Sequence, residues 1–195
     1  MTAAAAFAHP IGPHTVDDWR TAEHPTDGSR LELIWGYYHV SPAPGGPHQH
    51  ASGALYFALR QALRGNDRFH AVPAVAVEIS TAIRTGLIPD VAVLNTPPVA
   101  TSFPASALVL AVEVWSPGNS AHERETKVAG YANAGVPYLW TVELHSVGRA
   151  PSVRTYELVG GIYRDRTPVI PRDGDMHVVL PGPVGVSVDL ADLVP

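Results

Sequence analysis

Two acidic residues stand in runs that otherwise have the character of buried β-strands. Asp90 lies in IPDVAVL, and Glu113 interrupts the apolar run LVLAVEVW. A carboxylate in an apolar interior is costly unless it is paired or coordinates a cation. Two neighbouring strands can bring both side chains to one point, and paired carboxylates with open positions hold Mg²⁺ for phosphoryl chemistry. We therefore expect Asp90 and Glu113 to share one metal ion.

A positively charged side chain, Lys127, follows on a predicted helix. Glu123, Lys127 and Tyr131 are spaced four residues apart, so they project from one helix face. From there Lys127 can point back at the acids, where an ammonium orients or activates an attacking water and offsets charge on a phosphate. An ordinary i,i+4 salt bridge beside a half-buried tyrosine explains the same spacing, so the pattern alone leaves both interpretations open.

Helix and strand signals alternate around these residues. Thr15 and Asp18 predict the cap of a short helix, and residues 30–40 predict a hairpin that turns at Gly36. The further elements expected are a loop over 41–47, a helix over 48–64, β-rich stretches over 69–79 and 88–94 with a turn at Thr85 and Gly86, and a buried strand over 108–115.

The second half of the chain continues this alternation. Ser120 and Glu123 form a full capping box for a helix that runs to about residue 134. A strand over 137–144 follows, and then short strands broken by turns at residues 160–161, 173–174 and 181–183. The fold class expected is α/β.

The bulk composition is that of one folded domain. The chain has 195 residues, 46% of them hydrophobic and 16% charged, which is the range of globular proteins. We expect a flexible tail over residues 1–12 and a single domain over 13–195. The chain contains no cysteine, which excludes disulfides and thiolate chemistry and is typical of the cytoplasm. Neither a secretory signal nor an apolar run of roughly 20 residues is present, so we expect no membrane association.

The charge balance argues against nonspecific coating of nucleic acid. The formal net charge is −5, the wrong sign for that role. A basic face can still be local, and Arg60, Arg64 and Arg68 would align if their segment is helical. A solvated helix face accounts for the same three arginines.

Longer stretches of the chain resemble a known family. Pro89-Asp90 followed by Glu113 resembles the PD-(D/E)xK motif of restriction-endonuclease-like folds, although Trp115 occupies the lysine position. The string EVWSPGNSAHERETKVAGYANAGVPYLWTV, residues 113–142, is similar to the signature of the Uma-two family of endonucleases. RLELIWGYYHVSPAPGGPHQ, residues 30–49, resembles the opening hairpin of that family.

The resemblance implies a restriction-endonuclease-like core, with a central mixed β-sheet flanked by helices, an N-terminal hairpin and extra C-terminal strands. It implies a metal held by Asp90, Glu113 and the Val114 carbonyl, with Lys127 replacing the missing lysine. Other positions match the family with less definite roles. Glu32 is an additional ligand or a support, His48 lines the site, and Glu123 and Tyr131 occupy matching helix positions.

Two functions are consistent with these residues. One is a Mg²⁺-dependent endonuclease, with Mn²⁺ as a substitute, that hydrolyses phosphodiester bonds in DNA and is active as a homodimer. The other is a catalytically inactive nuclease-like fold that serves in binding or assembly. The serine-hydrolase elbow, the dinucleotide fingerprint and the P-loop are all absent from the sequence. Trp35, Trp115 and Trp140 are predicted to be core or interface residues rather than base-stacking platforms.

Overall fold

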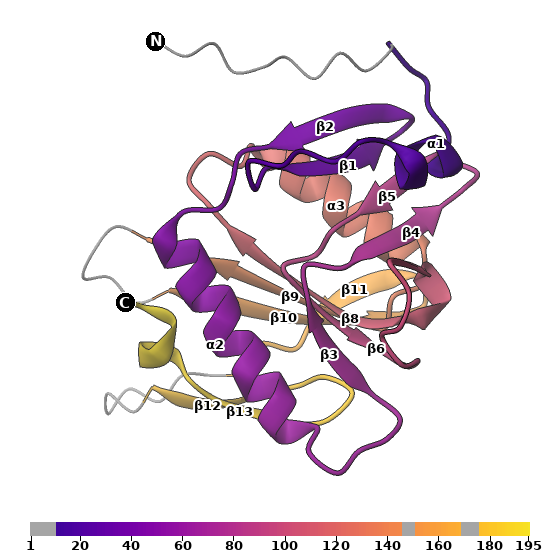
Figure 1. The fold of residues 1–195 in the computed structure, drawn as a ribbon. Helices are drawn as coiled ribbons and strands as arrows, with labels where there is room; N and C mark the ends of the chain where they lie inside the picture. The colour runs from indigo at the N-terminus through magenta and orange to yellow at the C-terminus, as the bar shows by residue number, and fades with distance from the viewer. Residues whose placement is uncertain (1–10, 146–150, 169–175) are drawn as a thin grey trace, which may run out of the picture.

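Two mixed β-sheets form the framework of the protein (Figure 1). The structure is a computed structural model that describes residues 11–145, 151–168 and 176–195. The five-stranded sheet has the order β2-β1-β5-β4-β7, and the six-stranded sheet has the order β11-β10-β9-β8-β6-β3. Strands β12 and β13 form a separate hairpin. The predicted mixed sheet is thus present, divided into two.

The strands of the five-stranded sheet are β1 (Arg30–Ile34), β2 (Tyr37–Ser41), β4 (Ala76–Ser80), β5 (Thr85–Leu87) and β7 (Ser102–Pro104). Those of the six-stranded sheet are β3 (His70–Pro73), β6 (Val91–Leu94), β8 (Leu108–Trp115), β9 (Tyr138–Glu143), β10 (Ser152–Val159) and β11 (Ile162–Asp165). The remaining elements are β12 (His177–Leu180), β13 (Val186–Asp189), the helices α1 (Val16–Thr21), α2 (Gly46–Ala62) and α3 (Ala121–Asn133), and the 3₁₀ turns η1 (Ala105–Ala107) and η2 (Leu190–Leu193).

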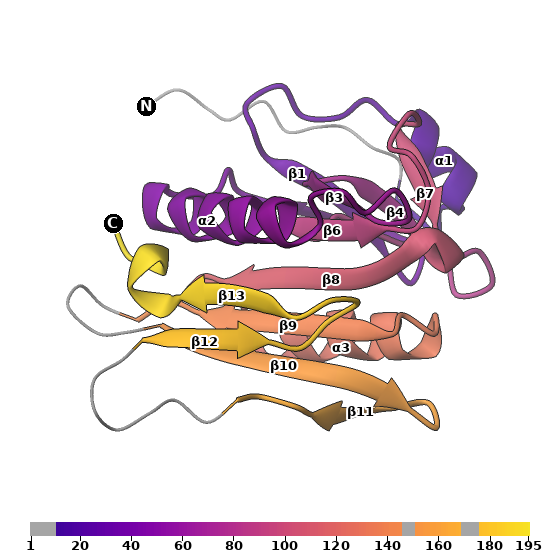
Figure 2. The same cartoon turned by 90° about the horizontal axis from the view of Figure 1, so that it is seen from below.

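Strand β8 runs through the middle of the six-stranded sheet and is buried along its whole length. It pairs antiparallel with β6 and parallel with β9, and α3 makes the crossover that a parallel pair requires. Apolar residues of α2 pack on one face of this sheet, and Tyr131 of α3 packs on the other. Figure 2 shows α2 in front of the sheet and α3 behind it. The continuous apolar run 108–115 therefore has the environment predicted for it.

Helix α1 packs on the five-stranded sheet through Trp19, which is buried and donates from its indole nitrogen to the Leu31 carbonyl at 2.8 Å. Its ring lies directly over Gly86, where an added Cβ would come within 2.3 Å of the indole. The predicted cap of α1 is confirmed, since the Thr15 hydroxyl accepts from the Asp18 amide at 3.1 Å and the Asp18 carboxylate accepts from Thr15.

Three predicted boundaries were wrong. Helix α2 begins at Gly46, before the predicted start, because Pro47 fits the first turn of a helix, where no amide hydrogen is needed. The helix ends at Ala62, so Arg68 is not on the helix and the three arginines do not share one face. Thr85 and Gly86 belong to strand β5, and the turn lies at residues 81–84 instead.

The β-rich stretch over 69–79 is two strands in different sheets. Strand β3 pairs with β6 in the six-stranded sheet, whereas β4 pairs with β5 and β7 in the other. The chain changes direction between them at Ala74, whose φ is +45°. A non-glycine residue in the left-handed region gives no sequence signal of a break.

The capping box predicted for α3 forms only in part. The Ser120 hydroxyl accepts from the Glu123 amide at 3.1 Å, but the Glu123 carboxylate accepts from Asn119 Nδ2 at 2.8 Å. The predicted turn at residues 173–174 and residues 1–10 of the predicted tail lie outside the described residues. Within the described part of the chain, none of the helices has the length and apolar character needed to span a membrane.

Candidate active site

A cavity of about 490 Å³ opens between the β1–β2 hairpin, the start of α2, the ends of β6 and β8, and the start of α3. The structure brings together at its wall nearly every residue predicted for the site, namely Glu32, His48, Asp90, Glu113, Val114, Glu123 and Lys127. Tyr131 does not line the cavity but reaches the Glu113 carboxylate from the helix beneath. Residues remote in the chain thus converge on one polar pocket.

The sheet register places the two predicted ligands side by side. Val91 pairs with Val112 in the antiparallel β6–β8 pair, and continuing that register by one residue sets Asp90 opposite Glu113. Residues opposite each other in an antiparallel pair point to the same face. The Val114 amide donates to Asp90 Oδ2 at 2.7 Å, which fixes the carboxylate against the end of β8.

Asp90 is held by two further side chains. Arg30 donates to Oδ1 in a short contact, and His48 Nε2 lies 3.2 Å from Oδ2. Burial alone would raise the pKa of Asp90, but the hydrogen bond from His48 and the charge of Arg30 outweigh it, so the pKa lies below its usual range. Asp90 is therefore a carboxylate at neutral pH.

Glu113 has the opposite electrostatic character. Tyr131 donates its hydroxyl to Oε1 at 2.6 Å, and Lys127 Nζ lies 3.4 Å from Oε2. Burial raises the pKa of Glu113 to about 8, against the opposing charge of Lys127, and the nearby charges of Asp90 and Glu32 raise it further. Glu113 thus holds a proton at neutral pH when no further cation is bound.

Lys127 joins the two sides of the cavity. Its ammonium lies 2.9 Å from Glu32 Oε2, and the Ile88 amide donates to Glu32 Oε1 at 2.8 Å. Burial would lower the pKa of Lys127, but the charges of Glu113 and Glu32 raise it above its usual value. The amine is therefore a fixed positive charge that Glu32 positions beside Glu113, rather than one end of a solvated surface pair.

The donor set fits a hard divalent cation. Asp90 and Glu113 offer carboxylate oxygens at one cavity wall, and Val114, which follows Glu113 in β8 and donates its amide to Asp90, lines the same wall. Within residues 11–145, 151–168 and 176–195, acidic and histidine side chains do not form a ready-made group of three around one point. Arg30 and Lys127 occupy the carboxylate oxygens, so a bound ion requires at least the Arg30 side chain to turn away.

Sequence reasoning missed Arg30. Its partner Asp90 lies 60 positions away in the sequence, and a single exposed-looking arginine at the start of a strand carries no signal of that pairing. The available signal was strand alternation, because Arg30 and Glu32 are two apart on β1 and so share a face. That face meets the cavity.

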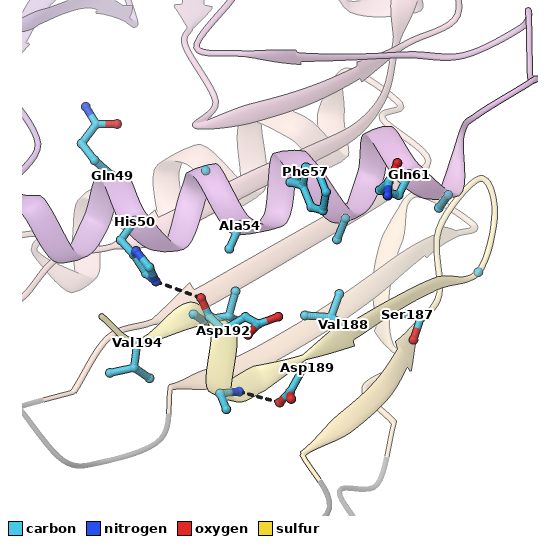
Figure 3. Close-up of a pocket in the computed structure, with 16 residues that line it drawn as sticks. Gln49, His50, Ala54, Phe57, Gln61, Ser187, Val188, Asp189, Asp192 and Val194 are labelled. Atoms are coloured by element: carbon cyan, nitrogen blue, oxygen red, sulfur yellow. Dashed lines mark hydrogen bonds between the residues drawn. The ribbon is translucent and has the colours of Figure 1, made fainter.

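A larger cavity lies elsewhere in the described chain. It measures about 910 Å³ and runs between α2 and the β13–η2 segment (Figure 3). Phe57 is 64% exposed on its wall, and His50 Nε2 lies 3.0 Å from the Asp192 carbonyl oxygen. It lacks the arrangement of acids around a buried cation that distinguishes the smaller cavity.

Comparison with known proteins shows the family and the fold of the chain. The sequence model of the Uma2 family, described as "Putative restriction endonuclease", matches residues 17–191. Among solved structures, one from Anabaena variabilis ATCC 29413, described as "a putative nuclease belonging to DUF820", is similar with a TM-score of 0.67 at 15% identity. That match covers 93% of this chain and 97% of the other. A search of curated proteins found no match.

Proposed function

Since the chain belongs to the Uma2 family and has a nuclease fold, we propose that it is a Mg²⁺-dependent endonuclease that hydrolyses phosphodiester bonds in DNA. The observation that carries the proposal is the cavity in which Asp90 and Glu113 meet from adjacent strands, with Lys127 Nζ 3.4 Å from Glu113. Fold likeness alone does not establish activity. The chemistry of this site is the stronger argument.

Asp90, Glu113 and the Val114 carbonyl would hold the metal, with Mn²⁺ as an alternative to Mg²⁺. When bound, such an ion stabilises negative charge on a phosphoryl oxygen and lowers the pKa of water. Lys127 orients the attacking water and offsets charge that develops on the phosphate. Tyr131 holds Glu113 Oε1, which leaves Oε2 directed at Lys127 and the cavity.

The residues around these three position them. Glu32 keeps the Lys127 ammonium in place through two contacts of 2.9 and 3.0 Å. His48 supports Asp90 from the first turn of α2, and its Nδ1 is buried without a partner among the described residues. Glu123 supports the loop before α3 through Asn119. Glu32, His48 and Glu123 are thus supporting residues in this proposal.

The test is cleavage of supercoiled plasmid by the purified chain. We expect nicking or cutting with Mg²⁺ or Mn²⁺, arrest by a chelator, and at least about a 100-fold loss in Asp90→Asn and Glu113→Gln, since each removes a metal-binding charge. Glu125→Gln, on the exposed side of α3, is the matched control and should keep full activity. Cleavage that persists in both site variants would contradict the proposal.

The negative net charge of the chain favours a second function, that of an inactive binding or assembly module. The net charge of −5 is unfavourable for binding DNA, and Arg30 and Lys127 already neutralise two of the acids. These facts suit a catalytically inactive fold used for binding or assembly. Calorimetric titration with Mn²⁺ separates the two, since an inactive fold of this kind would show no site that depends on Asp90.

A cytoplasmic location and a homodimer belong to the same proposal. The absence of cysteine suits a reducing compartment, and cutting both strands of a duplex is simplest with two sites related by a twofold axis. The β12–β13 hairpin, which faces the viewer in Figure 2, offers a pair of strands for such a contact.

A further inference from the structure

Trp35 differs from the other tryptophans of the chain. The sequence contains four, all within the described residues, and Trp19, Trp115 and Trp140 are at most 6% exposed. Trp35 is 55% exposed, so of the two predicted roles, core or interface residue, the core role is excluded. An indole on the surface contributes little to the hydrophobic core and needs another explanation.

The backbone at Trp35 is also unfavourable for a bulky side chain. Ile34 pairs with Tyr37, so Trp35 and Gly36 form a two-residue turn between β1 and β2. Their φ angles are +54° and +84°, the left-handed conformation of a type I′ turn. Such turns strongly favour Asn-Gly, and a large aromatic residue in this region is an outlier. Neither folding nor turn formation explains a tryptophan here.

Backbone hydrogen bonds hold the turn in place. The Gly36 amide donates to the Arg84 carbonyl at 2.8 Å, and its carbonyl accepts from the His14 amide at 2.6 Å. The Trp35 amide donates to Thr85 Oγ1 at 3.3 Å. The indole is therefore presented from a fixed support, which lowers the entropy lost when a ligand stacks on it.

The indole contacts the first turn of α3. His122 lies edge-on to Trp35 with ring centroids 6.2 Å apart, and it directly precedes Glu123, which lines the acidic cavity. Arg84, whose carbonyl accepts from the Gly36 amide, is exposed and makes no ion pair with a described residue. An aromatic face beside a cation suits a nucleotide, whose base stacks while its phosphate is neutralised.

We propose that Trp35 is a stacking platform for an unpaired nucleobase, so that the protein takes single-stranded or frayed nucleic acid in preference to intact duplex. This rests on the proposed nuclease function and specifies its substrate. Stacking works with every base and depends less on net charge than phosphate contacts do. It therefore provides affinity to a chain with a charge of −5.

The experiment uses the full chain in chelator, so that cleavage plays no part. Fluorescence anisotropy of a labelled 12-nucleotide oligothymidylate and of a matched 12-base-pair duplex gives the two affinities. Tryptophan emission is followed with unlabelled oligonucleotide. We expect tighter binding of the single strand and quenching of the exposed, long-wavelength part of the emission. The Trp35→Tyr variant should lose the quenching and retain binding within about threefold, because tyrosine also stacks.

The Trp35→Asn variant separates a binding role from a structural one. Asparagine suits the turn, so the melting temperature should stay equal or rise, whereas oligothymidylate affinity should fall by roughly 5- to 150-fold. Unchanged affinity in Trp35→Asn would overturn the proposal, as would wild-type protein that does not bind the single strand. Emission that changes with protein concentration alone would also overturn it and would identify a surface for self-association. Failure of this binding-competent chain to cleave single-stranded DNA with Mg²⁺ or Mn²⁺ would refute only the catalytic proposal.

Discussion

The three buried carboxylates of the cavity share too few cations to be fully neutralised. Asp90 is paired with Arg30, and Lys127 is divided between Glu32 and Glu113. Glu113 is the group that holds a proton as a result, with a pKa of about 8. A group kept neutral by burial is ready to bind a cation that replaces its proton.

Metal affinity should therefore depend on pH in a defined direction. Below pH 8 the free protein holds a proton on Glu113, and a cation binds the carboxylate only after that proton leaves. Affinity for Mn²⁺ should rise about tenfold per pH unit from pH 6 to 8 and then level off, because one proton is released per ion. Calorimetry in two buffers of different ionisation enthalpy measures that proton directly.

Glu113→Gln is the control for this titration. The amide does not ionise between pH 6 and 8, so any metal binding that remains should release no proton from this residue in that range. A wild-type affinity that is flat across this range would show that Glu113 is not a ligand, or that it is already ionised.

The candidate site residues were predictable from sequence where their sequence context is unusual. Asp90 and Glu113 stand out because charged residues interrupt strands that are otherwise apolar. Lys127 was predictable from its helical spacing. Arg30 and the exposure of Trp35 were not, because both depend on where the β1–β2 hairpin sits in the fold.

At the scale of elements, patterns longer than a turn were reliable. The strand over 108–115, the helix after Ser120 and the opening hairpin were confirmed because each has a continuous apolar run, a cap or a glycine turn. Strand β5 was mistaken for a turn because Thr85-Gly86 resembles turn sequence. Tertiary packing favours the strand instead, because the Trp19 ring covers Gly86 within the sheet.

Two glycine-to-alanine substitutions should change the free energy of unfolding in opposite directions. Gly86→Ala places a methyl group within 2.3 Å of the Trp19 ring and should lower the free energy of unfolding by roughly 1–3 kcal/mol. Gly53→Ala lies on the exposed side of α2 with open space around it and should raise it by roughly 0.5–1 kcal/mol. Urea denaturation measures both, and equal stability of Gly86→Ala and wild type would contradict the packing described for α1.

At the scale of the whole molecule, the site lies where separate parts of the fold meet. The five-stranded sheet supplies Glu32 and Arg30, the segment entering β6 supplies Asp90, β8 supplies Glu113, and α3 supplies Lys127. A sequence shows each of these elements but not their convergence. The division of the strands into two sheets, which creates the cavity, follows from pairings such as β4 with β7 that no local pattern specifies.

The most direct test of the account is a crystal structure of the protein soaked in Mn²⁺. We expect an anomalous peak between the carboxylates of Asp90 and Glu113, with metal–oxygen distances of about 2.1 Å and the Arg30 side chain turned away from Asp90. A structure at millimolar Mn²⁺ in which the Arg30–Asp90 ion pair is intact and no ion lies between the two acids would contradict it.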